Sequence, residues 1–136
     1  MADGFEPVED DEILYRRVPE HWYNAVTNEF DDQAFAPHAT RDVTGLSVSR
    51  AKYKSAEQAA AGRAGKRYYV AKLRAGDLRE AGIEIEQRPN TPGGIDPAHA
   101  ELPDLNSAKR KETLTLERLA SLSSKLCLGV EGPFQS

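Results

Sequence analysis

The sequence predicts an α+β fold, in which a small mixed or mainly antiparallel sheet carries short helices and a C-terminal amphipathic helix packed on one face. Three observations support this class. The run YYVAKL at 68–73 is rich in aromatic and β-branched residues, which is typical of a strand. The run IEIE at 83–86 alternates strictly between apolar and acidic residues. Apolar residues recur at helical spacing over 114–127.

Length and composition predict one folded domain with a tail at each end. The chain has 136 residues, and the 39% hydrophobic fraction is enough for a core at this size. Residues 1–12 include six acidic and no basic residues. We therefore predict an acidic flexible tail at 1–12, a single α+β domain at 13–128 and a C-terminal tail at 129–136.

Charge and cysteine content limit the partners and the compartment. The net charge of −4 disfavours nucleic acid overall, although Arg63, Lys66 and Arg67 form a local basic cluster. No apolar run approaches the ~20 residues that cross a bilayer, and the acidic N-terminus is unlike a secretory signal. Because Cys127 is the single cysteine, we expect a reducing, cytoplasmic protein. The oligomeric state is left open by the sequence.

The first half of the chain predicts two strands and one helix. Residues 13–18 have a strand pattern that Pro19 closes. Residues 24–42 show no period and predict a long irregular loop, anchored by Phe30 and Phe35. Residues 45–49 alternate as a half-buried strand does. Ser55 and Gln58 then form a capping box for a short helix over 56–61.

The second half predicts the remaining strands and the C-terminal helix. After the strand at 68–73, Asp77 caps a helix over 78–81, and residues 83–86 form a strand with both isoleucines inward. Turn residues at 90–94 lead to a last short strand at 98–102. A helix follows from near Ser107 and ends at Gly129 and Gly132. Its predicted apolar face consists of Leu114, Leu116, Leu119, Ala120, Leu122, Leu126 and Cys127.

Familiar catalytic and cofactor motifs do not occur in this sequence. It contains no Gly-x-Gly-x-x-Gly, no phosphate-binding P-loop, no Cys-x-x-Cys and no His-Glu-x-x-His. The three histidines, His21, His38 and His99, are far apart in the chain. We therefore predict no metal site.

Two adjacent arginines in the first strand form the first candidate site. Alternation directs either Arg16 or Arg17 toward the inner face, where an unpaired charge is costly. The inward arginine therefore needs a phosphate ligand or a structural ion pair with Glu84, Glu86 or Glu101. The pattern favours the ion pair.

Two pairs of polar residues are the other candidates. Ser47 and Ser49 share one strand face, where they either bind a ligand or point to solvent. His99 and Glu101 also share a face, two residues apart. That geometry suits an acid–base or ligand-orienting pair, and the pattern slightly favours the alternative, two polar residues on the solvent side of an edge strand.

Three motifs resemble a family of small, uncharacterised bacterial proteins. They are LYRR at 14–17, GLSVSRA at 45–51 and DPAHAEL at 96–102. The resemblance extends over residues 13–126. It implies no particular activity.

The order of residue types also resembles the ADP-ribosyltransferase superfamily, including the RES-type toxins that consume NAD. Those folds place an arginine on an early strand, a hydroxyl-bearing strand next and a catalytic glutamate late. The resemblance implies that Arg16 or Arg17 binds a phosphate, that Ser47 and Ser49 position the ribose, and that Glu101 stabilises an oxocarbenium ion.

Two functions follow from these observations. The sequence favours a small binding or regulatory module with a protein partner and no cofactor. The alternative is an NAD-consuming enzyme, with Arg16, Ser49, His99 and Glu101 as catalytic residues and with Arg17 and Ser47 binding the cofactor. The enzyme requires Arg16, Ser49 and Glu101 to lie around one site.

Overall fold

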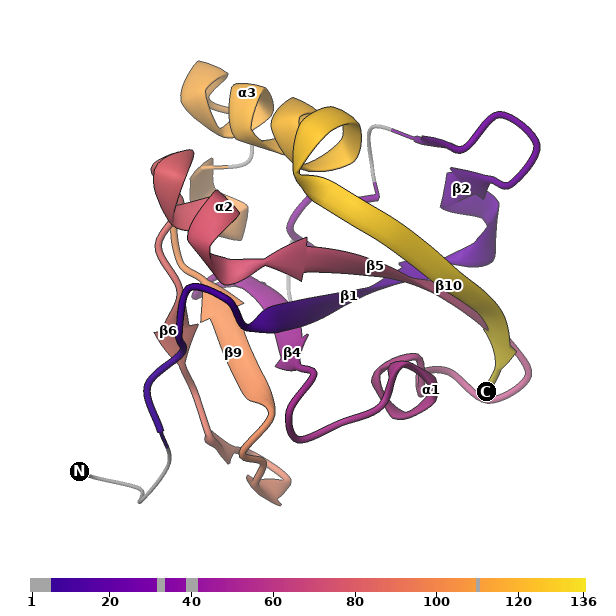
Figure 1. Cartoon of the computed structure of the whole chain (residues 1–136), viewed down its shortest axis with the longest axis horizontal. Coiled ribbons are helices and arrows are strands. Elements are labelled where there is room, and N and C mark those ends of the chain that lie inside the picture. Colours follow the sequence, from indigo (N-terminus) through magenta and orange to yellow (C-terminus); the bar gives the residue numbers. More distant parts are fainter. Residues whose placement is uncertain (1–5, 32–33, 39–41, 110) are drawn as a thin grey trace.

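The computed structural model describes residues 6–31, 34–38, 42–109 and 111–136, and it confirms the α+β class (Figure 1). Six strands form one sheet in which every neighbouring pair is antiparallel. In spatial order they are β10 (Cys127–Gln135), β5 (Arg67–Arg74), β1 (Ile13–Pro19), β4 (Leu46–Arg50), β9 (His99–Leu102) and β6 (Glu86–Gln87). Two hairpins form separate small sheets, β2 (Tyr23–Asn24) with β3 (Glu29–Phe30) and β7 (Asn90–Thr91) with β8 (Gly94–Ile95).

Helices cover the sheet on both of its faces. Consecutive side chains of a strand point to opposite faces, so β1 and β5 contribute to two apolar clusters. Leu14 and Leu73 belong to the main core, which α2 (Ala75–Glu80) and α3 (Thr113–Ser121) help to cover. Tyr68 and Val70 pack on the other face against α1 (Ala56–Ala59). Figure 1 shows α2 and α3 on one side of β5 and α1 on the other.

Several predicted elements are confirmed. The strands predicted at 13–18, 45–49, 68–73 and 98–102 correspond to β1, β4, β5 and β9, and the turn at 90–94 joins β7 to β8. The capping box is also present. The Gln58 backbone N–H donates to Ser55 Oγ at 3.1 Å, and the Ser55 N–H donates to Gln58 Oε1 at 2.9 Å. The helix that follows is shorter than predicted and ends at Ala59.

The prediction of a flexible acidic tail is wrong over residues 6–12, whereas residues 1–5 lie outside the described residues. Val8 is buried in the main core. The buried Arg50 guanidinium donates to both carboxylate oxygens of Glu12 and to the Glu6 carbonyl oxygen at 2.7–2.8 Å. A buried cation in the middle of the chain thus holds an acidic segment that by composition alone looks mobile.

The long loop predicted at 24–42 contains a hairpin. Strand β2 follows a short 3₁₀ helix, η1 (Glu20–Trp22), and pairs with β3. The predicted anchoring by Phe30 and Phe35 is confirmed, because their ring centroids lie 5.0 Å apart and Phe35 is buried in the main core.

The helix and the strand between β5 and β7 are displaced from their predicted positions. Helix α2 begins at Ala75, directly after β5, so Asp77 lies within its first turn and pairs with Arg74 instead of capping the helix. Only Glu86–Gln87 forms a strand. Ile83 is buried in the core, but its N–H donates to the Leu78 carbonyl at the end of α2. Both isoleucines face the core as predicted, Ile85 only in part, but only the last residue of IEIE belongs to a paired strand.

The C-terminal region differs most from its prediction. A 3₁₀ turn, η2 (Ser107–Lys109), precedes α3, whose N-cap is Glu112 and not Ser107, and a π-helical turn, η3 (Leu122–Leu126), follows α3. Residues 127–135 then form β10, where we expected a helix end and a tail. Gly129 and Gly132 lie inside this strand, next to its register shifts. An edge strand tolerates such residues, because one of its sides has no partner strand.

The face of α3 that packs on the core is narrower than predicted. Leu119 and Leu122 are buried, as predicted, and Leu126 packs partly against the same core. Leu114 and Leu116 are 55% and 53% exposed. Thr115, at a position that the leucine pattern does not include, is buried in their place.

Candidate functional site

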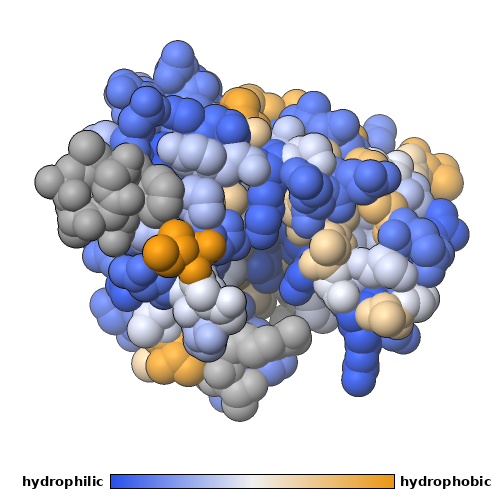
Figure 2. All heavy atoms as spheres, turned by 90° about the horizontal axis from the view of Figure 1, so that it is seen from below, coloured by the Kyte–Doolittle hydropathy of each residue, from blue (hydrophilic) through white to orange (hydrophobic). Residues whose placement is uncertain are grey.

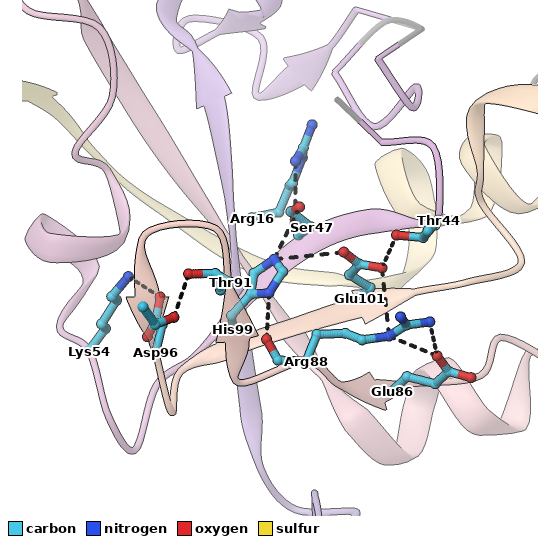
Figure 3. Close-up of polar contacts among 11 residues, drawn as sticks. Arg16, Thr44, Ser47, Lys54, Glu86, Arg88, Thr91, Asp96, His99 and Glu101 are labelled. Atoms are coloured by element: carbon cyan, nitrogen blue, oxygen red, sulfur yellow. Dashed lines mark hydrogen bonds and ion pairs between the residues drawn. The ribbon is translucent and has the colours of Figure 1, made fainter. Parts of the chain in front are cut away.

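The pairing of β4 with β9 brings the predicted hydroxyl and acid–base residues together. In this ladder Ser47 is opposite Glu101, and Ser49 is opposite His99. Opposed residues of antiparallel strands direct their side chains to the same face. The alternate residues of both strands, such as Val48 and Ala100, are buried in the core. The four polar side chains therefore form one group on the face opposite the main core, and Figure 3 shows Ser47, His99 and Glu101 of this group.

The hydrogen bonds of His99 assign its ring nitrogens different roles. His99 Nδ1 lies 2.8 Å from the backbone oxygen of Arg88, which can only accept a hydrogen bond. Nδ1 therefore carries a proton, and Nε2 is the acceptor in a neutral ring. Nε2 lies 3.4 Å from Ser47 Oγ and 3.9 Å from Glu101 Oε2. His99 thus presents a proton-accepting nitrogen between a hydroxyl and a carboxylate.

The two carboxylate oxygens of Glu101 have different surroundings, and its side chain is only 12% exposed. Thr44 Oγ1 donates to Glu101 Oε1 at 2.6 Å. Arg88 Nε lies 3.9 Å from the same oxygen, but Arg88 also hydrogen-bonds to Glu86 at 3.0 Å through Nε. Oε2 faces His99, as Figure 3 shows. One oxygen is therefore anchored by a neutral donor, and the other points into the polar group.

Arg16 contacts the backbone of this group from the opposite face of the sheet. The ladder between β1 and β4 pairs Leu14 with Arg50 and Tyr15 with Ser49. Arg16 is opposite Ala71 of β5, which is buried in the main core, so its side chain leaves β1 on the core face. Arg16 Nη1 donates to the backbone oxygen of Ser47 at 3.1 Å, and its guanidinium points away from His99 and Glu101 (Figure 3).

The structure separates Arg17 from this site. Its Nη1 donates to the Ala61 carbonyl oxygen beyond α1, and its guanidinium carbon lies 5.1 Å from the centroid of the Tyr68 ring. The ion pairs that we predicted for one arginine of β1 with Glu86 or Glu101 are made by Arg88. Ser47, Ser49, His99 and Glu101 are therefore together on one face, the Arg16 side chain lies on the opposite, core face, and the predicted cofactor-binding residue Arg17 points toward α1.

Sequence reasoning missed Thr44 and Arg88. Thr44 precedes β4, and Arg88 lies between β6 and β7, so neither belongs to a periodic pattern. Their roles depend on β9 lying between β4 and β6. No local signal in the sequence marks either residue.

Other kinds of site find little support in the described part of the chain. Among residues 6–31, 34–38, 42–109 and 111–136, no three His, Cys, Asp or Glu side chains are grouped as metal ligands. Burial raises the pKa of the Cys127 thiol, so that the thiol is protonated at neutral pH and is a poor nucleophile. None of the described helices is long and apolar enough to span a bilayer.

Comparisons of the chain with family models, with curated proteins and with solved structures found no match. The resemblances given above therefore rest on the sequence motifs, and what they imply stays a prediction. Function is therefore inferred from the geometry around Glu101.

Proposed function

We propose that the chain is an NAD-consuming enzyme, a glycohydrolase or ADP-ribosyltransferase, that acts at the site around Glu101. The observation that supports this proposal is the position of Glu101. Its carboxylate is largely buried, held through one oxygen by Thr44, and directed by the other toward His99 and Ser47. The hydroxyl and the glutamate of the resemblance lie on one face of neighbouring strands, whereas the Arg16 side chain lies on the core face and contacts the Ser47 backbone.

The proposed reaction begins with cleavage of the bond between the nicotinamide nitrogen and C1′ of the ribose. The electron pair of that bond moves to the nicotinamide ring and neutralises its positive charge. The ribose becomes an oxocarbenium ion, which the negative charge of Glu101 stabilises. Water or an acceptor group then attacks C1′ and loses a proton to Nε2 of His99, the nitrogen that the Arg88 hydrogen bond leaves as acceptor.

The remaining residues bind and orient the substrate in this proposal. Arg16 is assigned no contact with the substrate, because its guanidinium lies on the core face and contacts the Ser47 backbone. Ser47 and Ser49 form hydrogen bonds with the ribose next to the reacting carbon. The anchoring of Glu101 by Thr44 keeps the carboxylate in place without neutralising its charge.

A binding or regulatory module without catalysis is the second candidate. The exposed leucines of α3 favour it, because Leu114 and Leu116 are both more than half exposed on one helix. Each is an exposed apolar side chain available for contact with another protein, on either side of the buried Thr115. In this case the polar group on β4 and β9 has only a structural role.

The substitution Glu101→Gln distinguishes the two functions. Glutamine keeps the size of glutamate and can still accept from Thr44, but it lacks the charge. We expect nicotinamide release from NAD to fall by about a hundredfold or more, the scale of losing one preorganised electrostatic group. Glu117→Gln, at an exposed position of α3, is the matched control and should leave the rate unchanged. Thermal melts of each variant test folding.

Two results count against the enzyme. If the wild type releases no nicotinamide, with or without macromolecular acceptors, then the chain does not consume NAD. If release continues unchanged in Glu101→Gln, then the reaction does not depend on this carboxylate.

A further inference from the structure

A second region of the chain concentrates positive charge in a pocket. This pocket, of about 970 Å³, lies between the end of β1, η1 and the loop that joins α1 to β5. Its charged lining residues are one acid and four bases: Glu20, Arg17, Arg63, Lys66 and Arg67. The chain as a whole has a net charge of −4, so a local excess of positive charge is the opposite of its overall balance. We call it the basic pocket.

The loop that forms one wall of the basic pocket is held in place by Ser136. The Gly62 N–H donates to Ser136 Oγ at 2.7 Å, and the Gly65 N–H donates to the Ser136 backbone oxygen at 3.0 Å. In return, the Ser136 N–H donates to the Lys66 carbonyl oxygen at 2.9 Å. Figure 1 shows the end of β10 beside α1 and the start of β5. The loop backbone is therefore fixed by contacts distant in sequence.

Tyr68 forms a second fixed wall. Its hydroxyl accepts from the Arg63 N–H at 3.0 Å, and its ring packs so closely on the loop that a Cβ at Gly62 would lie 2.7 Å from ring carbons. On the same ring, the Arg17 guanidinium carbon lies 5.1 Å from the centroid. The basic pocket is thus built from positioned side chains.

The charges of the basic pocket are only partly neutralised. Arg67 pairs with Glu20 at 3.4 Å, and Arg17 donates to a backbone carbonyl. Within the described residues, the side chains of Arg63 and Lys66 make no polar contact. Four cations held around one concave surface repel each other, and an anion that enters between them lowers this energy.

We propose that the basic pocket binds a phosphate-bearing ligand of nucleotide size. Phosphate fits the arrangement better than a single carboxylate, because its oxygens can accept hydrogen bonds from donors on several sides. The volume lies within the range of roughly 300–1,000 Å³ that is typical of small-molecule sites. A free nucleotide and the terminal phosphate of a nucleic acid share this chemistry.

The basic pocket is distinct from the proposed catalytic site. Ser47, His99 and Glu101 do not line the basic pocket. Arg17 does line it, and its guanidinium does not contact the proposed catalytic residues. The proposal therefore stands whether or not the chain consumes NAD. It adds a second ligand to the molecule, as an effector or as an acceptor.

Titration calorimetry of the full chain at low salt tests the proposal. The probes are ATP, inorganic phosphate and a 5′-phosphorylated oligonucleotide. We expect the double variant Arg63→Gln/Lys66→Gln to bind ATP at least about tenfold more weakly, because each loses a charge-assisted hydrogen bond. Lys125→Gln, which removes one exposed charge from η3, should bind as the wild type does. Because both substituted side chains of the double variant are exposed, its melting temperature should not change.

The outcomes identify the source of the phosphate or overturn the proposal. Tighter binding of ATP than of the oligonucleotide assigns the basic pocket to free nucleotides, and the reverse order assigns it to nucleic acid ends. In both cases binding should weaken as salt is added. The proposal is wrong if no probe binds at millimolar concentration, or if the double variant binds as tightly as Lys125→Gln.

Discussion

Glu12 and Glu101 are both largely buried carboxylates, with side chains 8% and 12% exposed, but their partners differ. Both oxygens of Glu12 accept from the Arg50 guanidinium, at 2.7 and 2.8 Å. Glu101 accepts from the neutral Thr44 at 2.6 Å, and Arg88 and His99 lie 3.9 Å from its oxygens. The charge of Glu12 is neutralised by direct contact, whereas that of Glu101 can still act on a neighbouring group.

This difference separates a structural carboxylate from a candidate catalytic one. Arg50 is fully buried, and its remaining donors bind the carbonyl oxygens of Glu6 and Pro7. The pair therefore fixes the N-terminal segment to β4 and leaves no group free to act on a ligand. Burial alone identifies neither kind of residue. The number and distance of the cations around each carboxylate distinguish them.

The largest expected effect concerns Glu12. The substitution Glu12→Gln leaves the buried guanidinium of Arg50 without its counter-charge, and we expect the free energy of unfolding to fall by about 3–5 kcal/mol. Urea denaturation at pH 7 measures this change. Asp77→Asn, at the partly exposed pair with Arg74, is the matched control and should cost less than about 1 kcal/mol.

A double variant tests the reason for that loss. Replacing both partners, as in Glu12→Leu/Arg50→Met, removes the two charges together and should restore much of the lost stability. If the double variant is as unstable as Glu12→Gln, the loss arises from packing and the contrast with Glu101 is weaker than we infer.

The Arg50 pair also shows why part of the fold could not be predicted. Local patterns were sufficient for β1, β4, β5 and the Ser55–Gln58 capping box, because alternation and capping depend on neighbours in sequence. The docking of residues 6–12 depends on a cation about forty positions away. The pairing of β10 with β5 also joins segments that are far apart in the sequence. The glycines within β10 made this segment look like a tail when only local patterns were considered.

The candidate site was predictable to a similar extent. Alternation along β4 and β9 placed Ser47 with Ser49 and His99 with Glu101. The sequence could not show that the two strands are neighbours, nor that neither Arg16 nor Arg17 directs its guanidinium to them, because both facts depend on strand order and register. For the same reason it could not indicate the anchoring of Glu101 by Thr44.

A smaller effect on stability is expected at Glu101. Glu101→Gln should change the free energy of unfolding by less than about 1 kcal/mol, because the amide oxygen can still accept from Thr44 and the ion pair with Arg88, at 3.9 Å, is long. Urea denaturation alongside Glu12→Gln makes the comparison direct. A loss as large as that of Glu12→Gln would show that Glu101 is a structural residue, and the proposed catalytic role would lose its support.

The smallest effect concerns a third carboxylate, Asp96, whose side chain is 30% exposed. Burial raises its pKa, but hydrogen bonds from Lys54 and the Ala98 N–H, with the charges of Lys54 and His99, outweigh burial and lower the pKa below its ordinary value of 3.8. A lowered pKa in the folded state stabilises the protein above pH 3.8, and that contribution disappears as the pH falls through the lowered value.

We therefore expect Asp96→Asn to lower the melting temperature at pH 7 by about 1–4 °C, the scale of one partly exposed ion pair in a domain of this size. The difference from the wild type should shrink as the pH is lowered from about 5 to about 2, because both chains are then neutral at this position. Thermal melts across this range test the sign. A difference that stays constant with pH would mean that Asp96 acts through its hydrogen-bond geometry and not through its charge. Asp96 would then differ from Glu12, whose contribution to stability depends on the charge of Arg50.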